Sequence, residues 1–292
     1  MQVKLAAKKL LQKSPPVFRF AKKTNQEVRR FYESLLNNVD LILPHGEVPP
    51  RKFRLHTGPA EFLTVGKAWV QQFVAYGGLK PQERVLDVGS GVGRVAVALT
   101  SYLDSTGSYE GFDMYADGVA WCRRHITPRF PNFHFQQADI YNGIYNNRGK
   151  YRADEYKFPY DDGSFDFVFL MSVFTHMLPR DVEQYFSEIA RVLKKNGRCF
   201  TTFFLLNDES RALIEAKAST YNFQHKGDGY QTVEEAEPET AVAYEEKYIC
   251  GLYEKNGFDI ITPIHYGSWC GRKETMFQDF VVARKERGLE KN

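Results

Sequence analysis

The stretch V-L-D-V-G-S-G-V-G-R-V-A-V-A-L, from Val85 to Leu99, decides the fold that we predict for this chain. Its first residues form an apolar run typical of a buried parallel strand, and its last residues are typical of an apolar helix. Gly89, Gly91 and Gly93 lie in the turn between them, where a backbone without side chains can pass close to a ligand. The N-terminus of the following helix offers unpaired N–H groups to an anionic group. The stretch therefore predicts a ligand-binding turn between a strand and a helix.

The rest of the chain continues this alternation of strands and helices. Further strands are predicted at residues 109–113, 133–138, 165–171, 198–206, 258–265 and 279–284, and helices at 62–76, 116–125, 181–194 and 244–255. Alternating strands and helices predict a mostly parallel sheet with helices on both faces. The last two strands have no helix between them, so we expect them to pair antiparallel.

The glycine spacing separates two kinds of nucleotide-binding turn. A dinucleotide-binding turn would have glycine or alanine three residues after Gly91, where this chain has Arg94. With Asp87 two residues before the first glycine, D-V-G-S-G-V-G resembles the first motif of class I S-adenosylmethionine-dependent methyltransferases. This resemblance implies an α/β fold with a Rossmann-like seven-stranded sheet and an antiparallel last strand.

Two later strand ends strengthen the resemblance. Gly111-Phe112-Asp113 ends the second strand with an acid that can accept both hydroxyls of a ribose, as it also could in an NAD enzyme. Ala138-Asp139-Ile140 ends the third strand, where the matching acid of the methyltransferase family bonds to the adenine amino group. The fourth strand and the segment after it, G-S-F-D-F-V-F-L-M-S-V-F-T-H-M-L, are similar to the family's segment beside the methyl donor. The resemblance covers residues 79–206 and, more loosely, the final strands.

The resemblance implies S-adenosylmethionine as the cofactor and implies no metal. It assigns to the cofactor the motif residues Asp87, Gly89, Ser90, Gly91, Gly93, Asp113, Met114, Asp139, Ile140, Met171 and Ser172. Asp87 is expected near the methionine amino group, either directly or by ordering the turn.

The residues that meet the methyl acceptor carry a weaker signal. His176 follows the fourth strand, where a neutral imidazole could accept the proton of an acceptor hydroxyl, or could simply pack at the start of a helix. Tyr266, Trp269 and Arg272 lie between the last two strands and are either a wall for a polar acceptor or ordinary packing residues.

The flanking segments define the predicted domain organisation. Residues 1–60 form a basic extension that contains one short amphipathic helix and a proline-rich loop, and residues 61–292 form the methyltransferase domain. A polar insertion after the fifth strand, at about 207–243, is expected to cap the acceptor site because specificity usually comes from segments added to a scaffold. The basic helix is either a solvated or oligomer-packing arm or a contact with the inner face of a membrane, and the oligomeric state stays open.

Composition excludes several classes of function. A net charge of +3 over 292 residues is too small for a surface that follows nucleic acid. The four cysteines form no metal-binding pair, and no stretch approaches the ~20 apolar residues of a membrane span, so we expect a cytoplasmic protein with reduced thiols. The segment after the fourth strand lacks the Asp/Asn-Pro-Pro-aromatic motif of enzymes that methylate base amines.

The function predicted from these observations is transfer of a methyl group from S-adenosylmethionine to a small-molecule or glycan acceptor, with oxygen favoured over nitrogen. Two alternatives remain from the sequence: a non-catalytic cofactor-binding subunit that regulates or scaffolds a partner, and an NAD-dependent oxidoreductase. The sequence does not name the acceptor.

Overall fold

The structure is a computed structural model that describes residues 48–54 and 62–286. The chain divides into two compact units, Met1–Pro59 and Ala60–Asn292. In the first unit the described residues contain helix α4 (Arg51–Arg54), whose first turn is closed by a hydrogen bond from the Phe53 amide to the Pro50 carbonyl. The amphipathic helix predicted near the N-terminus lies outside the described residues.

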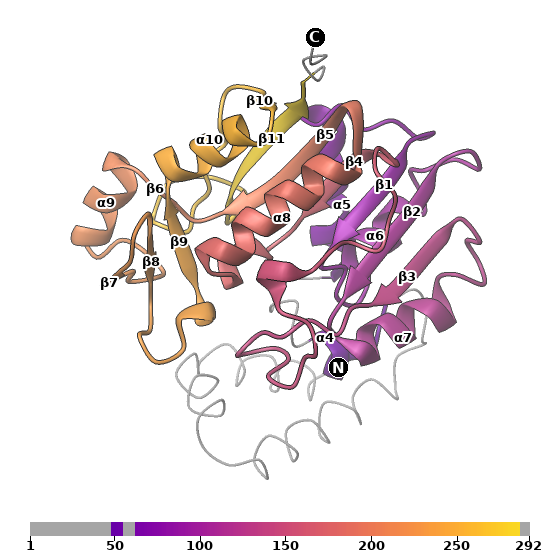
Figure 1. Ribbon diagram of the computed structural model, residues 1–292, viewed down its shortest axis with the longest axis horizontal. Coiled ribbons are helices and arrows are strands. Elements are labelled where there is room, and N and C mark those ends of the chain that lie inside the picture. The colour runs from indigo at the N-terminus through magenta and orange to yellow at the C-terminus, as the bar shows by residue number, and fades with distance from the viewer. Residues whose placement is uncertain (1–47, 55–61, 287–292) are drawn as a thin grey trace, which may run out of the picture. The chain divides into compact units, whose positions relative to one another are not determined.

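The second unit is built on a seven-stranded sheet of order β10-β11-β5-β4-β1-β2-β3 (Figure 1). The strands are β1 (Arg84–Val88), β2 (Ser108–Asp113), β3 (Phe133–Gln137), β4 (Phe165–Leu170), β5 (Leu193–Phe203), β10 (Phe258–Ile260) and β11 (Asp279–Lys285). β1 pairs parallel with β2 and β4, whereas β11 lies antiparallel between β5 and β10. The predicted α/β architecture, including the antiparallel last strand, is confirmed.

Helices cover both faces of this sheet, because its central strands are apolar on both sides. They are α5 (Phe62–Ala75), α6 (Arg94–Leu99), α7 (Ala116–His125), α8 (Pro179–Val192) and α10 (Glu246–Lys255). Phe73 of α5 packs against Phe167 and Phe169 of β4 on one face. Val168 and Leu170 point to the other face, into a core that includes Phe186 of α8. Figure 1 shows α8 in front of the sheet and α5 behind it.

The insertion after β5 folds into a second sheet, which the sequence did not predict. Its order is β6-β9-β8-β7, and its elements are β6 (Leu205–Leu206), α9 (Asp208–Glu215), β7 (His225–Lys226), β8 (Tyr230–Thr232), the 3-10 helix η4 (Pro238–Thr240) and β9 (Val242–Glu245). A core of its own lies beneath this sheet and includes Phe204, Phe223 and Trp269. We call residues 204–245 the cap.

Several predicted boundaries are wrong. The strand predicted at 258–265 ends at Ile260, and the strand predicted at 198–206 begins at Leu193 and ends at Phe203. Two of the helix boundaries are wrong for physical reasons. The helix predicted at 244–255 begins at Glu246, because Val242–Glu245 pairs with both β6 and β8. The helix predicted to reach residue 194 ends at Val192, because Leu193 already pairs with Phe165 of β4. Two further 3-10 helices, η2 (Ala153–Glu155) and η3 (Phe174–His176), lie on either side of β4 in the sequence. Within the described ranges, no helix has the length and hydropathy needed to cross a bilayer.

Candidate cofactor and acceptor site

The glycine turn after β1 has a backbone that other residues could not easily adopt. Gly89, Gly91 and Gly93 have φ values of 89°, 55° and 76°. A Cβ atom on Gly89 would lie 2.5 Å from Cγ2 of Val173, and one on Gly93 would lie 2.8 Å from Sγ of Cys122. These positions therefore require glycine for two reasons: the positive φ, and the lack of room for a side chain beside the segment after β4 and beside α7.

Hydrogen bonds tie the same turn to the end of β2. The amides of Gly89 and Ser90 donate to the Phe112 carbonyl at 2.9 and 3.1 Å. The Asp113 carboxylate accepts from the Gly91 amide at 2.6 Å and from the Tyr115 amide at 2.7 Å. Burial raises the pKa of Asp113, and the hydrogen bonds from these amides oppose that shift. The glycine turn after β1 and the acid at the end of β2, both predicted to bind the cofactor, are thus joined by hydrogen bonds.

Asp87 is a buried carboxyl group with an unusual protonation equilibrium. Its side chain is 3% exposed, and its Oδ2 accepts a hydrogen bond of 2.6 Å from the Tyr109 hydroxyl. Burial raises the pKa of Asp87 to about 8, against the lowering effect of that hydrogen bond and with a small addition from Asp113. A carboxyl group that burial holds protonated near neutral pH is ready to ionise when a cation arrives beside it. The sequence did not single out Tyr109.

The third predicted acid lies in a more open place. Asp139 is exposed, and its Oδ1 accepts a hydrogen bond of 3.2 Å from Asn146, which also donates to the Ile140 carbonyl at 2.9 Å. Ile140 itself is buried in the main core, with Met114 packed against that core. The structure therefore places an accessible carboxylate beside apolar side chains, which suits recognition of a planar base with an amino group.

The segment after β4 contains a strained residue. Ser172 has a φ of 59°, which is uncommon for a residue with a side chain. Residues with such backbone angles are often found at functional sites. Its amide donates to Oγ1 of Thr202 at 2.8 Å, and its hydroxyl donates to Oε1 of Gln278 at 2.9 Å. Met171 precedes it and is partly buried. Thr202 and Gln278, which the sequence did not reveal, hold this conformation from β5 and from the start of β11.

His176 ends η3 and is held by the cap. Its Nδ1 lies 3.0 Å from the Glu239 carbonyl oxygen, which can only accept, so Nδ1 carries the proton and donates. Its Nε2 lies 3.4 Å from the hydroxyl of Tyr145, in the segment after β3. Asn142 joins the same group by donating to the His176 carbonyl at 3.1 Å and to Oε1 of Glu239 at 3.0 Å. The tautomer so fixed leaves a proton-accepting nitrogen at Nε2.

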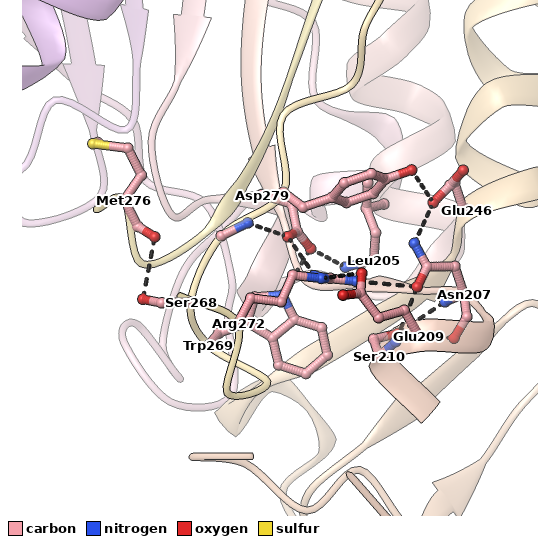
Figure 2. Close-up of polar contacts among 12 residues, drawn as sticks. Leu205, Asn207, Glu209, Ser210, Glu246, Ser268, Trp269, Arg272, Met276 and Asp279 are labelled. Carbon is pink, nitrogen blue, oxygen red and sulfur yellow. Dashed lines mark hydrogen bonds and ion pairs between the residues drawn. The ribbon is translucent and has the colours of Figure 1, made fainter. Parts of the chain in front are cut away.

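The three residues predicted as an acceptor wall belong to a network of contacts around the buried Asp279 (Figure 2). Trp269 has no exposed surface, and its Nε1 donates to Oδ2 of Asp279 at 2.7 Å. The Arg272 guanidinium lies 3.4 Å from Oδ1 of Asp279 and 4.7 Å from the Tyr266 ring centre. Tyr266 donates to Oε2 of Glu246 at 3.0 Å. This set joins the cap to β11, and Trp269 offers no surface to an acceptor in this arrangement.

A polar ligand with an anionic group would satisfy donors that the turn leaves unpaired. Among the residues that the structure describes, the buried Ser90 hydroxyl has no hydrogen-bond partner, and neither do Nε and Nη2 of Arg94 at the start of α6. Buried donors without partners are uncommon in native proteins and point to a bound group. Together with Asp87 for a cation and Asp113 and Asp139 for hydroxyl and amino groups, the site fits an amino acid joined to a nucleoside. Arg94 could have been found from its place directly after the third glycine.

The seven-stranded sheet with its antiparallel last strand is the Rossmann-like fold of methyltransferases, and comparison with known proteins agrees with this fold. Residues 86–201 match the family described as "Methyltransferase domain". The segment that contains the glycine turn, the strand ends after β2 and β3 and the segment after β4 is therefore similar to a methyltransferase domain, and this family and fold imply S-adenosylmethionine as the cofactor.

Known relatives extend the comparison. The ubiquinone/menaquinone biosynthesis C-methyltransferase UbiE of Xanthomonas axonopodis is 27% identical over 136 residues, which are 47% of this chain and 48% of that protein. The PH0226 protein of Pyrococcus horikoshii superimposes with a TM-score of 0.54 at 17% identity, covering 79% of this chain and 93% of that one. An S-adenosylmethionine-dependent methyltransferase of Methanosarcina mazei gives a TM-score of 0.50 at 19% identity, covering 73% and 97%. The chain spans 31% to 62% of the length of the curated relatives that it matches.

Proposed function

We propose that this chain is an enzyme that transfers the methyl group of S-adenosylmethionine to a hydroxyl group of a small-molecule or glycan acceptor. The observation that carries the proposal is the position of His176 at the end of the segment after β4, with Nδ1 donating to the Glu239 carbonyl. This hydrogen bond orients the ring and fixes the tautomer, so that Nε2 can accept a proton. A hydroxyl acceptor needs such a base more than an amine does, and this favours oxygen as the methylated atom.

The cofactor would be held by the elements already described. Asp87 would pair with its amino group, the Ser90 hydroxyl and the Arg94 guanidinium would meet its carboxylate, Asp113 its ribose and Asp139 its adenine. When bound, S-adenosylmethionine supplies a methyl group on a positively charged sulfur. The protein's part is alignment and exclusion of water, together with removal of the acceptor proton.

The side chains of His176 and Tyr145 determine how the proton leaves the acceptor. His176 takes the proton of the acceptor hydroxyl at Nε2 and becomes an imidazolium, whose charge the Glu239 carbonyl at Nδ1 stabilises. The Tyr145 hydroxyl lies 3.4 Å from Nε2 in the structure, so the acceptor hydroxyl must take that place beside the ring. The proton then leaves to solvent when the product departs.

The test is a turnover assay on the full chain with methyl-labelled S-adenosylmethionine and a panel of sugars, phenols and amines, read by mass spectrometry of the products. Replacing His176 by Gln should lower kcat by about 10²-fold or more while leaving the affinity for S-adenosylhomocysteine unchanged. His134→Gln is the matched control, because that histidine is 54% exposed and pairs with Glu110 on the neighbouring strand. Equal turnover in the two variants would remove His176 from the mechanism.

The two alternatives predicted from the sequence have their own outcomes in this assay. Binding of S-adenosylhomocysteine with no methylated product from any acceptor would support a non-catalytic subunit. Affinity for NAD without affinity for S-adenosylmethionine would contradict the proposal altogether.

A further inference from the structure

A cavity in the described part of the chain is lined by Glu239, the residue whose carbonyl holds His176. It is a cavity of about 440 Å³ between the segment after β3 and the η4 turn of the cap. Tyr141, Ile144, Leu178 and Pro238 give it an apolar lining. Its size is within the range of small-molecule sites. Tyr141 is 48% exposed, so part of this residue is accessible to a partner.

The polar part of the lining is strongly acidic. Asp154, Asp181, Glu237 and Glu239 line the cavity together with a single guanidinium, that of Arg152. That guanidinium already forms an ion pair of 2.5 Å with Asp154. An acceptor that carries phosphate or carboxylate would therefore meet like charges, with no unpaired cation among the described residues of the lining. An acceptor rich in hydroxyl or amino groups would find carboxylate oxygens that accept its hydrogen bonds.

Glu239 connects this cavity to the base. Its carboxylate accepts from the Gly143 amide at 2.6 Å and from Asn142 at 3.0 Å, while its carbonyl accepts from Nδ1 of His176. One residue of the cap therefore lines the cavity and orients His176. Glu239 therefore links the cavity to the Nδ1 side of the His176 ring.

We propose that this cavity is the subsite for the sugar part of the acceptor, and that it takes an uncharged or amino-substituted pyranose and rejects an anionic one. The proposal rests on the proposed function, since it places the acceptor of the same reaction. An aromatic side chain beside carboxylates suits a pyranose. The C–H face of the sugar packs on the tyrosine ring, while the sugar hydroxyls donate hydrogen bonds to the carboxylates.

The experiment measures binding, so it does not depend on turnover. Full-length protein saturated with S-adenosylhomocysteine is titrated with methyl glucopyranoside, with the corresponding methyl glucosaminide and with the corresponding methyl glucuronide, followed by saturation-transfer NMR and calorimetry. We expect the first two to bind and the glucuronide to bind at least about tenfold more weakly, because it brings a like charge beside the acidic lining. Equal affinity for all three, or no binding of any, would overturn the proposal.

Two pairs of variants place the binding in this cavity. Tyr141→Ala should weaken methyl glucopyranoside binding by about fivefold, the scale of one lost aromatic contact. Tyr151→Ala, on an equally exposed tyrosine of the same segment that does not line the cavity, should leave it unchanged. Glu237→Arg should reduce the discrimination against the glucuronide, whereas Glu235→Arg, at a side chain 89% exposed and outside the lining, should not. Equal effects within either pair would place the sugar elsewhere.

Affinity for S-adenosylhomocysteine is measured in every variant and separates the two ideas. If the wild-type protein binds S-adenosylhomocysteine but no pyranose, the subsite is wrong and the methyltransferase proposal stands. If it does not bind S-adenosylhomocysteine, the proposed function fails, whatever the sugars do.

Discussion

The protonation of Asp87 makes a quantitative prediction about cofactor binding. Its pKa of about 8 means that the carboxyl group is mostly protonated at neutral pH, and a cationic amino group must displace that proton to gain a charge-assisted contact. The ionised fraction is about one in a hundred at pH 6 and about one in ten at pH 7. The affinity for S-adenosylhomocysteine should therefore rise about tenfold between pH 6 and pH 7, with release of close to one proton per ligand.

Two variants isolate the carboxyl group from its neighbours. Asp87→Asn should bind weakly at both pH values and should lose the proton release that comes from Asp87. Tyr109→Phe removes the hydrogen bond that lowers the pKa of Asp87, so the pH dependence should persist to higher pH and the affinity at pH 7 should fall. The other carboxyl group facing Asp87 is Asp113, whose pKa is also raised by burial, so the slope that survives in Asp87→Asn measures its contribution.

The assay is calorimetry in two buffers of different ionisation enthalpy, which gives the proton count directly. The reasoning is refuted if the wild-type protein releases no proton on binding, or if Asp87→Asn keeps the full tenfold dependence. Either result would mean that the amino group of the ligand does not meet Asp87.

Three further predictions concern stability and are read from urea unfolding. Because the pKa of Asp87 is raised above its ordinary value of 3.8, the stability that its protonation contributes is complete below about pH 4 and is lost as pH rises toward 8; Asp87→Asn should flatten that fall. Gly89→Ala should lower the free energy of unfolding by about 1–3 kcal/mol and should weaken cofactor binding, because of the positive φ and because the new methyl group would meet Val173. Gly163 has a φ of 60° but lies in open space, so Gly163→Ala should lower that free energy by about 1 kcal/mol and leave cofactor binding intact. Asp279→Ala should lower the free energy of unfolding by about 3–5 kcal/mol, because two buried backbone amides and the Trp269 indole lose their acceptor. The Arg272 guanidinium loses only its contact with Asp279 and keeps Glu209 and Asn207. Asp259→Ala, at an exposed position of β10, should cost little, and equal unfolding midpoints within either pair would contradict the packing argument.

The main sheet could be predicted because its signals are local. α7 has the predicted bounds and β1 contains the apolar run that begins at Val85, since an apolar run and a helical period are each contained in a few consecutive residues. The cofactor motifs could be placed for the same reason, because strand ends in a parallel sheet meet at one edge.

The cap and its contacts could not be predicted, because they depend on residues far apart in the chain. The strand Val242–Glu245 has a sequence that continues smoothly into a helix, and only its pairing with β6 and β8 makes it a strand. Glu239 reaches His176 across 63 positions, and no local pattern announces that contact. The sequence leaves Trp269 and Arg272 as either an acceptor wall or packing residues, and only their contacts with the buried Asp279 in the tertiary structure show where they lie. The acceptor side of the site therefore needs the tertiary structure.

The join between the cap and the main domain sets how this protein could be re-engineered. Between β5 and β6 lies only Phe204, whose carbonyl accepts from the Tyr244 amide, and the next amide, that of Leu205, is held by the buried Asp279. Replacing the whole cap by a segment from another protein, with junctions at these residues, would also remove hydrogen bonds that stabilise the main domain. Exchange of residues 218–241 with Glu239 retained would preserve those hydrogen bonds and the contact that orients His176, while replacing most of the cavity's η4 wall. Libraries aimed at new acceptors should be confined to that segment and to the facing residues 141–144.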